Sequence, residues 1–317
     1  MRFLIAGAGS WGTAFAHVLL ERGHEVVLGC HHAEQAEAIN ATGRNPRYLS
    51  IVDLSRASAV PLDEAPADVD IVVVAVPSRA FADVVERLPG EAPVLSLTKG
   101  LDPATGERLS TTVRRRGVAV LSGPNMAEEI AVGMPTAAVI ASVDGFLAGQ
   151  LQHAINSTVF RAYVNPDVIG VELCAAAKNV IALAAGGVDG LDIGDNAKAS
   201  LITRGLAEMA RLGTAAGARN ETFSGLAGMG DLIVTCWSRH GRNRRAGELI
   251  AQGRSPEDAV AEIGQTVEGL TTAPVLHELS NRLGVELPIT AGVCSVLSGR
   301  DLQALLGDLM GRQPTEE

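Results

Sequence analysis

The chain has 317 residues, of which 47% are hydrophobic and 20% charged, a balance typical of a globular protein long enough for two domains and not of a disordered one. Its formal net charge of −10 disfavours general affinity for nucleic acid, so any cluster of cations is local. The four cysteines are scattered without CxxC spacing, which argues against a disulfide scaffold and against a metal site.

The start of the sequence does not have the pattern of a secretion signal. Gly7 interrupts its apolar run too early for the apolar region of a signal peptide, and no uninterrupted apolar run approaches ~18 residues. We therefore expect a soluble, cytoplasmic protein without membrane attachment.

The first predicted elements form a dinucleotide-binding motif. An apolar run over residues 2–6 precedes Gly7-Ala8-Gly9-Ser10-Trp11-Gly12, and an amphipathic stretch then runs to Arg22, which predicts strand, glycine turn and helix. A second apolar run, over residues 25–30, predicts the next strand. In this setting the glycines let backbone N–H groups approach a pyrophosphate at the positive end of the helix. We expect an NAD or NADP site here; the alternative is a glycine turn without a ligand.

The residues after the second strand concern the choice between NAD and NADP. An NAD-selective site places Asp or Glu about 20 residues after the glycines, where it binds the ribose hydroxyls. Here His31 and His32 occupy that place, with Glu34 two residues beyond, so no carboxylate directly repels a 2′-phosphate. The histidines either bind that phosphate or are solvent-exposed turn residues. After a predicted helix over residues 33–40, Tyr48 either covers the adenine or merely packs.

Two further runs predict buried strands. Residues 70–76 are almost continuously β-branched and end at Pro77, which is typical of a parallel strand covered on both faces. Residues 94–100 repeat the pattern, with Lys99 at the carboxyl end, where open α/β sheets bind ligands. A lysine at a strand end is often a solvated charge, but beside a cofactor crevice we favour a role in the site.

A second strand-to-helix turn comes next. A predicted strand over residues 118–121 leads into Ser122-Gly123-Pro124-Asn125, and the free N–H groups of such a turn suit an anion or a hydroxyl. The cationic run over residues 114–116 is interpreted as a solvated helix end. Strands over residues 136–141 and 159–164 complete the predicted sheet.

Beyond Pro166 the strand signals almost vanish and apolar residues recur at helical spacing. We therefore predict a doubly wound, Rossmann-like α/β domain over residues 1–165 and an all-α domain over residues 166–310. A polar tail over residues 311–317 follows.

The first helix of the second domain carries a lysine in apolar surroundings. Residues 173–185 are apolar except for Lys178 and Asn179, and Gly186 and Gly187 suit a C-cap, which predicts a buried helix that ends there. Lysine is rarely buried without a partner or a function. Lys178 either extends its ammonium to the surface or acts in a site. We favour the site because no second polar residue at helical spacing gives the helix a solvated face.

Two later segments add charged groups. After a predicted amphipathic helix over residues 196–209, a glycine-dense turn presents the carboxylate of Asp231. Residues 238–245 then concentrate four arginines in an acidic chain, and the planar guanidinium matches phosphate oxygens. The cluster suggests a phosphorylated substrate, with a solvated helix start as the alternative.

In combination these motifs resemble the bacterial NAD(P)-dependent glycerol-3-phosphate dehydrogenases. The resemblance runs in order from Arg2 to about Leu309. It rests on the glycine turn and on Val76-Pro77-Ser78, Thr98-Lys99-Gly100, Ser122-Gly123-Pro124, Ala177-Lys178-Asn179-Val180, residues 201–209, residues 228–232, Arg242-Asn243-Arg244-Arg245 and Val267-Glu268-Gly269. It implies reversible reduction of dihydroxyacetone phosphate to sn-glycerol 3-phosphate, a phospholipid precursor, with NADH or NADPH.

The resemblance also implies roles for single residues. Lys178 matches the proton donor and acceptor, with Lys99 and Asp231 beside it. The positions that match substrate contacts are Lys99, Gly123, Asn125, Lys178, Asp231, Gly241, Arg242 and Asn243. Those that match cofactor contacts are Ser10, Trp11, His31, Lys99, Ala127, Arg242, Thr266 and Glu268. Asn125 and Gly241 stand where the family often has hydroxyl residues, so we expect an amide contact at 125 and backbone contacts at 241.

Two other functions are considered. A two-domain dehydrogenase acting on a β-hydroxy acid would bind a carboxylate, and the arginine cluster disfavours it. A non-catalytic dinucleotide sensor would need the glycine turn but not Lys178, Lys99 and Asp231 together. We expect a homodimer formed through the helical domain, from the commonness of two-fold assemblies and from the resemblance.

Overall fold

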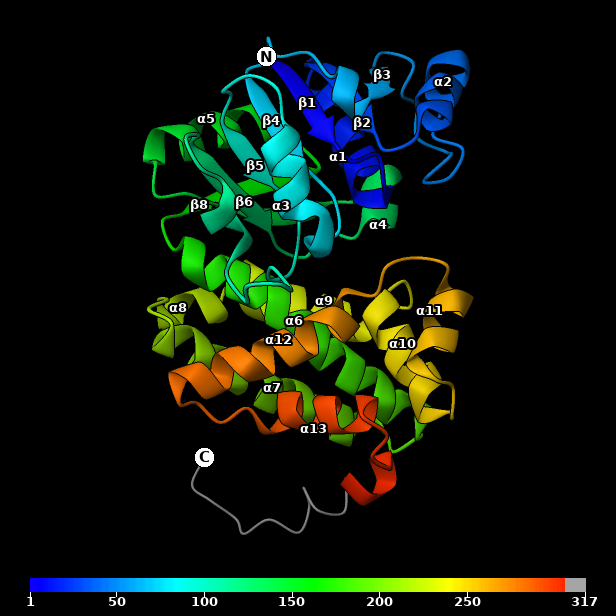
Figure 1. Ribbon diagram of the computed structural model, residues 1–317, viewed down its shortest axis with the longest axis vertical. Helices are drawn as coiled ribbons and strands as arrows, with labels where there is room; N and C mark the ends of the chain where they lie inside the picture. Colours follow the sequence, from blue (N-terminus) through cyan, green and yellow to red (C-terminus); the bar gives the residue numbers. More distant parts are fainter. Residues whose placement is uncertain (306–317) are drawn as a thin grey trace.

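The computed structural model describes residues 1–305 and shows a sheet-and-helix half above a helical half (Figure 1). The polar tail predicted over residues 311–317, and the last residues of the predicted helical domain, lie outside the described part. The predicted fold class, a doubly wound α/β domain followed by an all-α one, is confirmed.

An eight-stranded sheet forms the first half, in the order β3-β2-β1-β4-β5-β6-β7-β8. Its strands are β1 (Arg2–Ala6), β2 (Glu25–Cys30), β3 (Ser58–Pro61), β4 (Ile71–Val74), β5 (Val94–Ser96), β6 (Val118–Ser122), β7 (Thr136–Ala141) and β8 (Phe160–Asn165). The pairs are parallel except for β6 with β7, so β7 and β8 run opposite to the others. Strand order reverses between β1 and β4, which is where such sheets bind dinucleotides.

Helices cover both faces of this sheet. They are α1 (Ser10–Glu21), α2 (Ala33–Thr42), α3 (Ser78–Arg87), α4 (Ala127–Ala131) and α5 (Gly145–Ile155), with 3₁₀ turns η1 (Leu62–Glu64) and η2 (Leu109–Thr112). Alternate residues of β1 enter opposite cores: Phe3 packs in the cluster that includes Phe15 of α1, and Leu4 in the cluster that includes Phe81 of α3. Burial on both faces explains why the strands read as continuous apolar runs.

The outer edge of β8 is closed by side chains. The backbone N–H of Ala162 donates to Asn156 Oδ1 (2.7 Å), and its carbonyl accepts from Gln152 Nε2 (2.9 Å). Phe160 is held in the same way by Ser157, through both backbone and side chain. Because these groups are already bonded, this part of the edge offers little to another strand.

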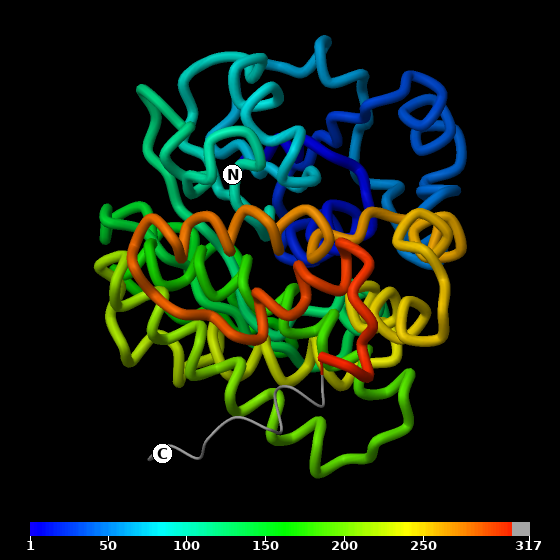
Figure 2. Tube along the Cα trace, turned by 60° about the horizontal axis from the view of Figure 1, so that its bottom comes forward, coloured from blue at the N-terminus to red at the C-terminus, as the bar shows by residue number. Residues whose placement is uncertain are grey.

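The second half is helical and is built around α6 (Val168–Gly190). Its other elements are α7 (Asp195–Ala215), α8 (Asn220–Phe223), the π-helical turn η3 (Leu226–Gly230), α9 (Asp231–Trp237), α10 (Arg242–Ala251), α11 (Pro256–Ile263), α12 (Glu268–Leu283) and α13 (Pro288–Leu297). Among the described helices α6 alone is long and apolar enough to cross a membrane, but it is largely buried, as a soluble protein's core helix is. Figure 2 shows α12, in orange, along the boundary between the two halves.

The predicted end of the central helix was wrong. α6 continues through Gly186 and Gly187 to Gly190. A Cβ on Gly186 would lie 1.8 Å from the carbonyl oxygen of Arg244, and one on Gly247 would lie 1.9 Å from that of Leu183. The glycines therefore allow α6 and α10 to cross with their backbones almost in contact, which is a tertiary requirement and not a helix stop.

Other differences concern the sheet. β3 was not predicted, because its four residues at the sheet edge lack a β-branched run. The strand expected over residues 94–100 ends at Ser96, so Lys99 lies on the loop after β5 and not within the strand.

Candidate active site

The three glycines of the turn between β1 and α1 have different surroundings. Gly7 has φ of +114°, and a Cβ there would lie 2.5 Å from the carbonyl oxygen of Ala75. A Cβ on Gly12 would lie 1.9 Å from the carbonyl oxygen of Gly7. A Cβ on Gly9 would meet no atom of the described residues within 4 Å. Gly7 and Gly12 are thus required by the turn itself, and Gly9 leaves open space at the N-terminus of α1, where a pyrophosphate fits.

Polar side chains from the following segment hold this turn. The carbonyl of Ala8 accepts from Gln35 Nε2 and from Asn45 Nδ2, both at 2.9 Å. Asn45 Nδ2 also lies 2.8 Å from Thr13 Oγ1, and both amide residues are buried. Gln35 and Asn45 were not predicted to lie here, because only the fold brings them to the turn. Their bonds fix the backbone whose N–H groups face the open space.

The residues proposed for the adenine end lie between β2 and β3. His31 and His32 are both exposed, with ring centroids 4.5 Å apart, and Glu34 is exposed in the first turn of α2. Tyr48 is half-buried, and the guanidinium of Arg47 lies 5.8 Å from its ring centroid. The structure does not join these side chains to the lysine network described below.

Trp11 and Ala127 lie on neighbouring helices. Both pack against the same core cluster, and the ring centroid of Trp11 is 5.6 Å from that of Phe15. Trp11 Nε1 is buried and has no hydrogen-bond partner in the described residues. A buried donor without a partner is costly, so this N–H suits a ligand acceptor.

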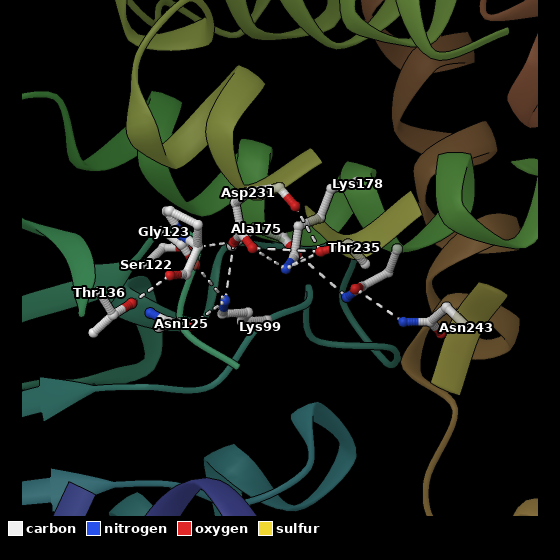
Figure 3. A network of polar contacts seen from close by, with 12 residues as sticks. Lys99, Ser122, Gly123, Asn125, Thr136, Ala175, Lys178, Asp231, Thr235 and Asn243 are labelled. Carbon is white, nitrogen blue, oxygen red and sulfur yellow. Dashed lines mark hydrogen bonds and ion pairs between the residues drawn. The ribbon is translucent and has the colours of Figure 1, made fainter. Parts of the chain in front are cut away.

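Two lysines share one carboxylate between the two halves (Figure 3). Lys178 Nζ lies 2.5 Å from Asp231 Oδ1, and Lys99 Nζ lies 2.9 Å from Asp231 Oδ2. Lys178 is 4% exposed and Asp231 is 1% exposed. Lys178 comes from the middle of α6, Asp231 from the start of α9, and Lys99 from the loop after β5. The structure thus assembles the three predicted groups from segments far apart in the chain.

Hydroxyl groups complete the carboxylate's surroundings. Thr235 Oγ1 accepts from Lys178 Nζ at 2.9 Å, and Ser122 Oγ donates to Asp231 Oδ2 at 3.2 Å. Neither hydroxyl was predicted to take part in this network. Thr235 was detectable in principle, since four residues after Asp231 on a helix places it on the same face.

Lys99 is held by two further acceptors. Its ammonium donates to the carbonyl of Gly123 (3.2 Å) and to Asn125 Oδ1 (2.8 Å). The amide oxygen of Asn125 is therefore occupied, and its buried Nδ2 has no partner within residues 1–305. Asn125 can therefore donate a hydrogen bond to a ligand through Nδ2. A serine or threonine at this position, bonded to Lys99, would donate through its hydroxyl instead.

Burial dominates the electrostatics of this network. It lowers the pKa of Lys178 to about 7, with Lys99 acting in the same direction and Asp231 opposing it. Burial alone would raise the pKa of Asp231, but the ammonium groups of Lys178 and Lys99 hold it below its ordinary value. The result is an ionised carboxylate that orients a lysine able to exchange a proton near neutral pH.

The start of α10 lies beside this network. Asn243 Nδ2 donates to Asn179 Oδ1 (3.0 Å), and Asn243 Oδ1 accepts from the N–H of Gly269 (2.8 Å). No role was predicted for Asn179, although it is the other polar residue in the apolar run. Gly241 is the N-cap of α10, and a Cβ on it would lie 2.9 Å from the carbonyl oxygen of Thr235.

The arginines of residues 238–245 have different partners in the structure. Arg244 pairs with Asp189 (2.6 Å), and Arg245 pairs with Glu248 and Glu262. Arg242 is exposed and donates to the carbonyl of Thr266 at 3.1 Å. Two of the four arginines are therefore engaged with carboxylates, and Arg242 lies exposed at the first position of α10.

Glu268 connects the two halves. Its carboxylate accepts from the backbone N–H of Ser78 (3.2 Å) and from Ser78 Oγ (2.6 Å). A Cβ on Gly100 would lie 3.3 Å from Glu268 Oε2, so this contact is adjacent to the lysine loop. No group of three or more His, Cys, Asp or Glu side chains suited to a metal occurs among the described residues.

Known proteins resemble this chain over nearly its whole length. A family described as NAD-dependent glycerol-3-phosphate dehydrogenase matches residues 3–148 by its N-terminus and residues 167–305 by its C-terminus. The chain is 44% identical to glycerol-3-phosphate dehydrogenase [NAD(P)+] of Chlorobium limicola, over 100% of this chain and 99% of that protein. It is 42% identical to the enzyme of the same name from Bacillus cereus, over 98% and 96%. A crystal structure of glycerol-3-phosphate dehydrogenase from Coxiella burnetii superposes with a TM-score of 0.94 at 37% identity, over 98% and 99%.

Proposed function

The chain belongs to the NAD-dependent glycerol-3-phosphate dehydrogenase family, and from that premise we propose how its own residues carry out the reaction. The reaction is the reversible reduction of dihydroxyacetone phosphate to sn-glycerol 3-phosphate with NADH or NADPH. The observation that carries the assignment of roles is the buried Lys178–Asp231 pair, with Lys99 on the other carboxylate oxygen.

The residues fit a dinucleotide. The open space at Gly9 and the unpartnered Trp11 Nε1 lie at the turn, where the N–H groups of residues 9–12 would hold the pyrophosphate. His31, His32 and Tyr48 would line the adenosine end. Ser10 is a further proposed cofactor contact at the turn. The other proposed cofactor contacts are Lys99, Ala127, Arg242, Thr266 and Glu268. When bound, the reduced nicotinamide supplies the hydride to the carbonyl carbon of the substrate.

Lys178 is the proposed proton donor in reduction and the acceptor in the reverse direction. With its pKa lowered to about 7, the ammonium gives up a proton far more readily than an ordinary lysine. Asp231 and Thr235 fix its direction, because both bond to Nζ. Lys99 supplies a second positive charge where negative charge develops on the substrate oxygen.

The remaining side chains position the substrate. Asn125 Nδ2 donates to a substrate oxygen, since its oxygen is already bonded to Lys99. Gly123, which accepts from Lys99, supplies a backbone contact at the same end as Asn125. Arg242, the N–H of Asn243 and the backbone of Gly241 hold the phosphate at the N-terminus of α10. Both ends of the small substrate are then fixed relative to Lys178.

The direct test is the loss of NADH or NADPH absorbance with dihydroxyacetone phosphate. We expect turnover with both cofactors and very poor turnover with dihydroxyacetone, which lacks the phosphate. Turnover of β-hydroxy acids in place of dihydroxyacetone phosphate would favour the other class of dehydrogenase. Cofactor binding without turnover of any of these substrates would favour a sensor.

The arrangement of the whole molecule is also proposed. We place the domain division between residues 165 and 166, after β8. We also place the protein in the cytoplasm.

We expect a homodimer through the helical domain. The closed β8 edge disfavours sheet extension, and Ile193, Ile233 and Trp237 expose apolar side chains on the helical half. The sheet half also exposes apolar side chains, among them Val143 and Phe146, so the resemblance and not the exposed area points to the helical domain. Light scattering after gel filtration measures the mass; a monomer at micromolar concentration would contradict the dimer.

A further inference from the structure

The loop that follows Lys99 crosses from the sheet domain to the helical domain. We call residues 101–112 the bridging loop. Leu101, two residues after Lys99, is 2% exposed and belongs to the core cluster of the helical domain with residues of α6 and α12. The loop folds back on itself, because Leu101 and Arg108 form an isolated antiparallel bridge and the N–H of Asp102 donates to the carbonyl of Glu107 at 2.9 Å.

One buried carboxylate on α6 receives the end of this loop. Glu172 is 3% exposed, and its oxygens accept from the backbone N–H of Ser110 (2.8 Å), from Ser110 Oγ and from Arg108 (2.9 Å). These donors all come from the bridging loop. A buried carboxylate without donors is strongly unfavourable, so α6 and the loop hold each other in place.

The same helix carries the proton donor. Glu172 and Lys178 are six residues apart on α6, which separates them by about 9 Å along the helix axis. Lys178 is therefore positioned by α6 directly, and Lys99 by α6 through Glu172 and the bridging loop. Figure 3 shows how close the two lysine ammonium groups come at Asp231.

We propose that Glu172 is a positioning residue that sets the place of the Lys99 ammonium relative to Lys178. This role goes beyond the proposed function but rests on it. Glu172 does not touch the lysine network; it acts through Arg108, Ser110 and the loop.

The position of Lys99 affects the pKa of the proton donor, Lys178. The groups that face Lys178 are Asp231, Lys99, Thr235 and Cys236, and Lys99 is the cation among them that lowers its pKa. Arg108 is the charged group that faces Glu172 from the loop. If Lys99 moves away, the pKa of Lys178 rises, and the pH above which reduction slows should rise with it.

The test uses Glu172→Gln in the full-length enzyme, alone and combined with Lys99→Ala. In the wild-type background we expect kcat for dihydroxyacetone phosphate reduction to fall by about 10-fold, as a small misplacement of an active-site group does, and the alkaline limb of its pH profile to move to higher pH. In the Lys99→Ala background we expect Glu172→Gln to change kcat by less than about 2-fold and not to move the limb, because the group that it positions is already gone.

Glu208→Gln is the matched control. Glu208 is an equally buried acid of the helical domain, but it caps α13 through the N–H groups of Ile289 and Thr290. We expect it to lower the melting temperature comparably and to leave the pH profile in place. If Glu172→Gln does not fold, Ser110→Ala removes one donor from the same contact and should move the limb in the same direction by a smaller amount.

The outcomes separate the two proposals. Additive effects of Glu172→Gln and Lys99→Ala, or an unmoved alkaline limb with Glu172→Gln, would overturn the positioning role while the wild type still turns over its substrate. A wild-type enzyme that does not reduce dihydroxyacetone phosphate would instead overturn the proposed function.

Discussion

The two ends of the proposed cofactor and substrate site are built differently. At the lysine end, Lys178 and Asp231 are almost fully buried, and the network uses bonds from α6, α9 and two loops of the sheet domain. At the adenine end, His31 and His32 are exposed and contact each other. Changing a buried charge takes a partner away from another buried charge, whereas an exposed imidazole can be replaced at little cost. We therefore expect the chemistry to be fixed at one end and the choice of cofactor to be adjustable at the other.

The largest expected effect is at the centre of the buried end. Lys178→Met removes the proton donor but keeps an apolar stem, so it should lower kcat by at least ~100-fold. Asp231 keeps Lys99 as a partner, and we expect the variant to fold and to bind NADH, as measured by thermal denaturation and by fluorescence titration. Turnover within a few fold of wild type would show that another group carries the proton.

Arg242, at the rim of the same end, should give the next largest effect. Arg242→Ala removes a charge-assisted contact to the substrate phosphate, which we expect to cost about 2–3 kcal/mol, or roughly 30- to 150-fold in kcat/KM. Arg245→Ala is the matched control, because Arg245 pairs with Glu248 and Glu262 instead. Equal losses in the two variants would mean that the charge of the cluster matters and not the position of Arg242.

The sequence predicted the lysines of the buried end better than the residues that hold them in place. A lysine in an otherwise apolar helix and another beside a strand end are local patterns, and both lie in the network. The carboxylate of Glu172 was not noticed, because its partners Arg108 and Ser110 are more than 60 residues away in the chain. Gly186 was mistaken for a helix end because its close contact with Arg244 exists only after α10 has packed on α6.

The direction of β7 could not be predicted for a related reason. Its run, residues 136–141, was located correctly, but an apolar run has no direction until its neighbours are known. Hydrophobic periodicity indicates which residues are buried. The places where helices cross, and the donors that bind a buried carboxylate, depend instead on residues that are far apart in the sequence.

The pH dependence of turnover distinguishes the two ends further. Lys178 has a pKa lowered to about 7 and must be protonated to act as the acid, so reduction should be fastest below that pH and fall by about tenfold per pH unit above it. Oxidation of sn-glycerol 3-phosphate needs the neutral amine and should rise through the same range. In Asp231→Asn the carboxylate that raises this pKa is gone, so the limb should move to lower pH. Profiles of kcat in both directions test this, and parallel profiles would exclude a shared acid and base.

The smallest expected effect is at the exposed end. No carboxylate at His31 or His32 repels a 2′-phosphate, so NADPH should bind no worse than NADH. Either imidazole can donate a hydrogen bond to that phosphate. His32→Asp places a negative charge there and should reverse any preference for NADPH, whereas His32→Asn keeps a hydrogen-bond donor without adding a charge and should change the preference less. The measurement is kcat/KM for both cofactors in the three proteins. A strong preference of the wild type for NADH would mean that Glu34, in the first turn of α2, binds the ribose instead.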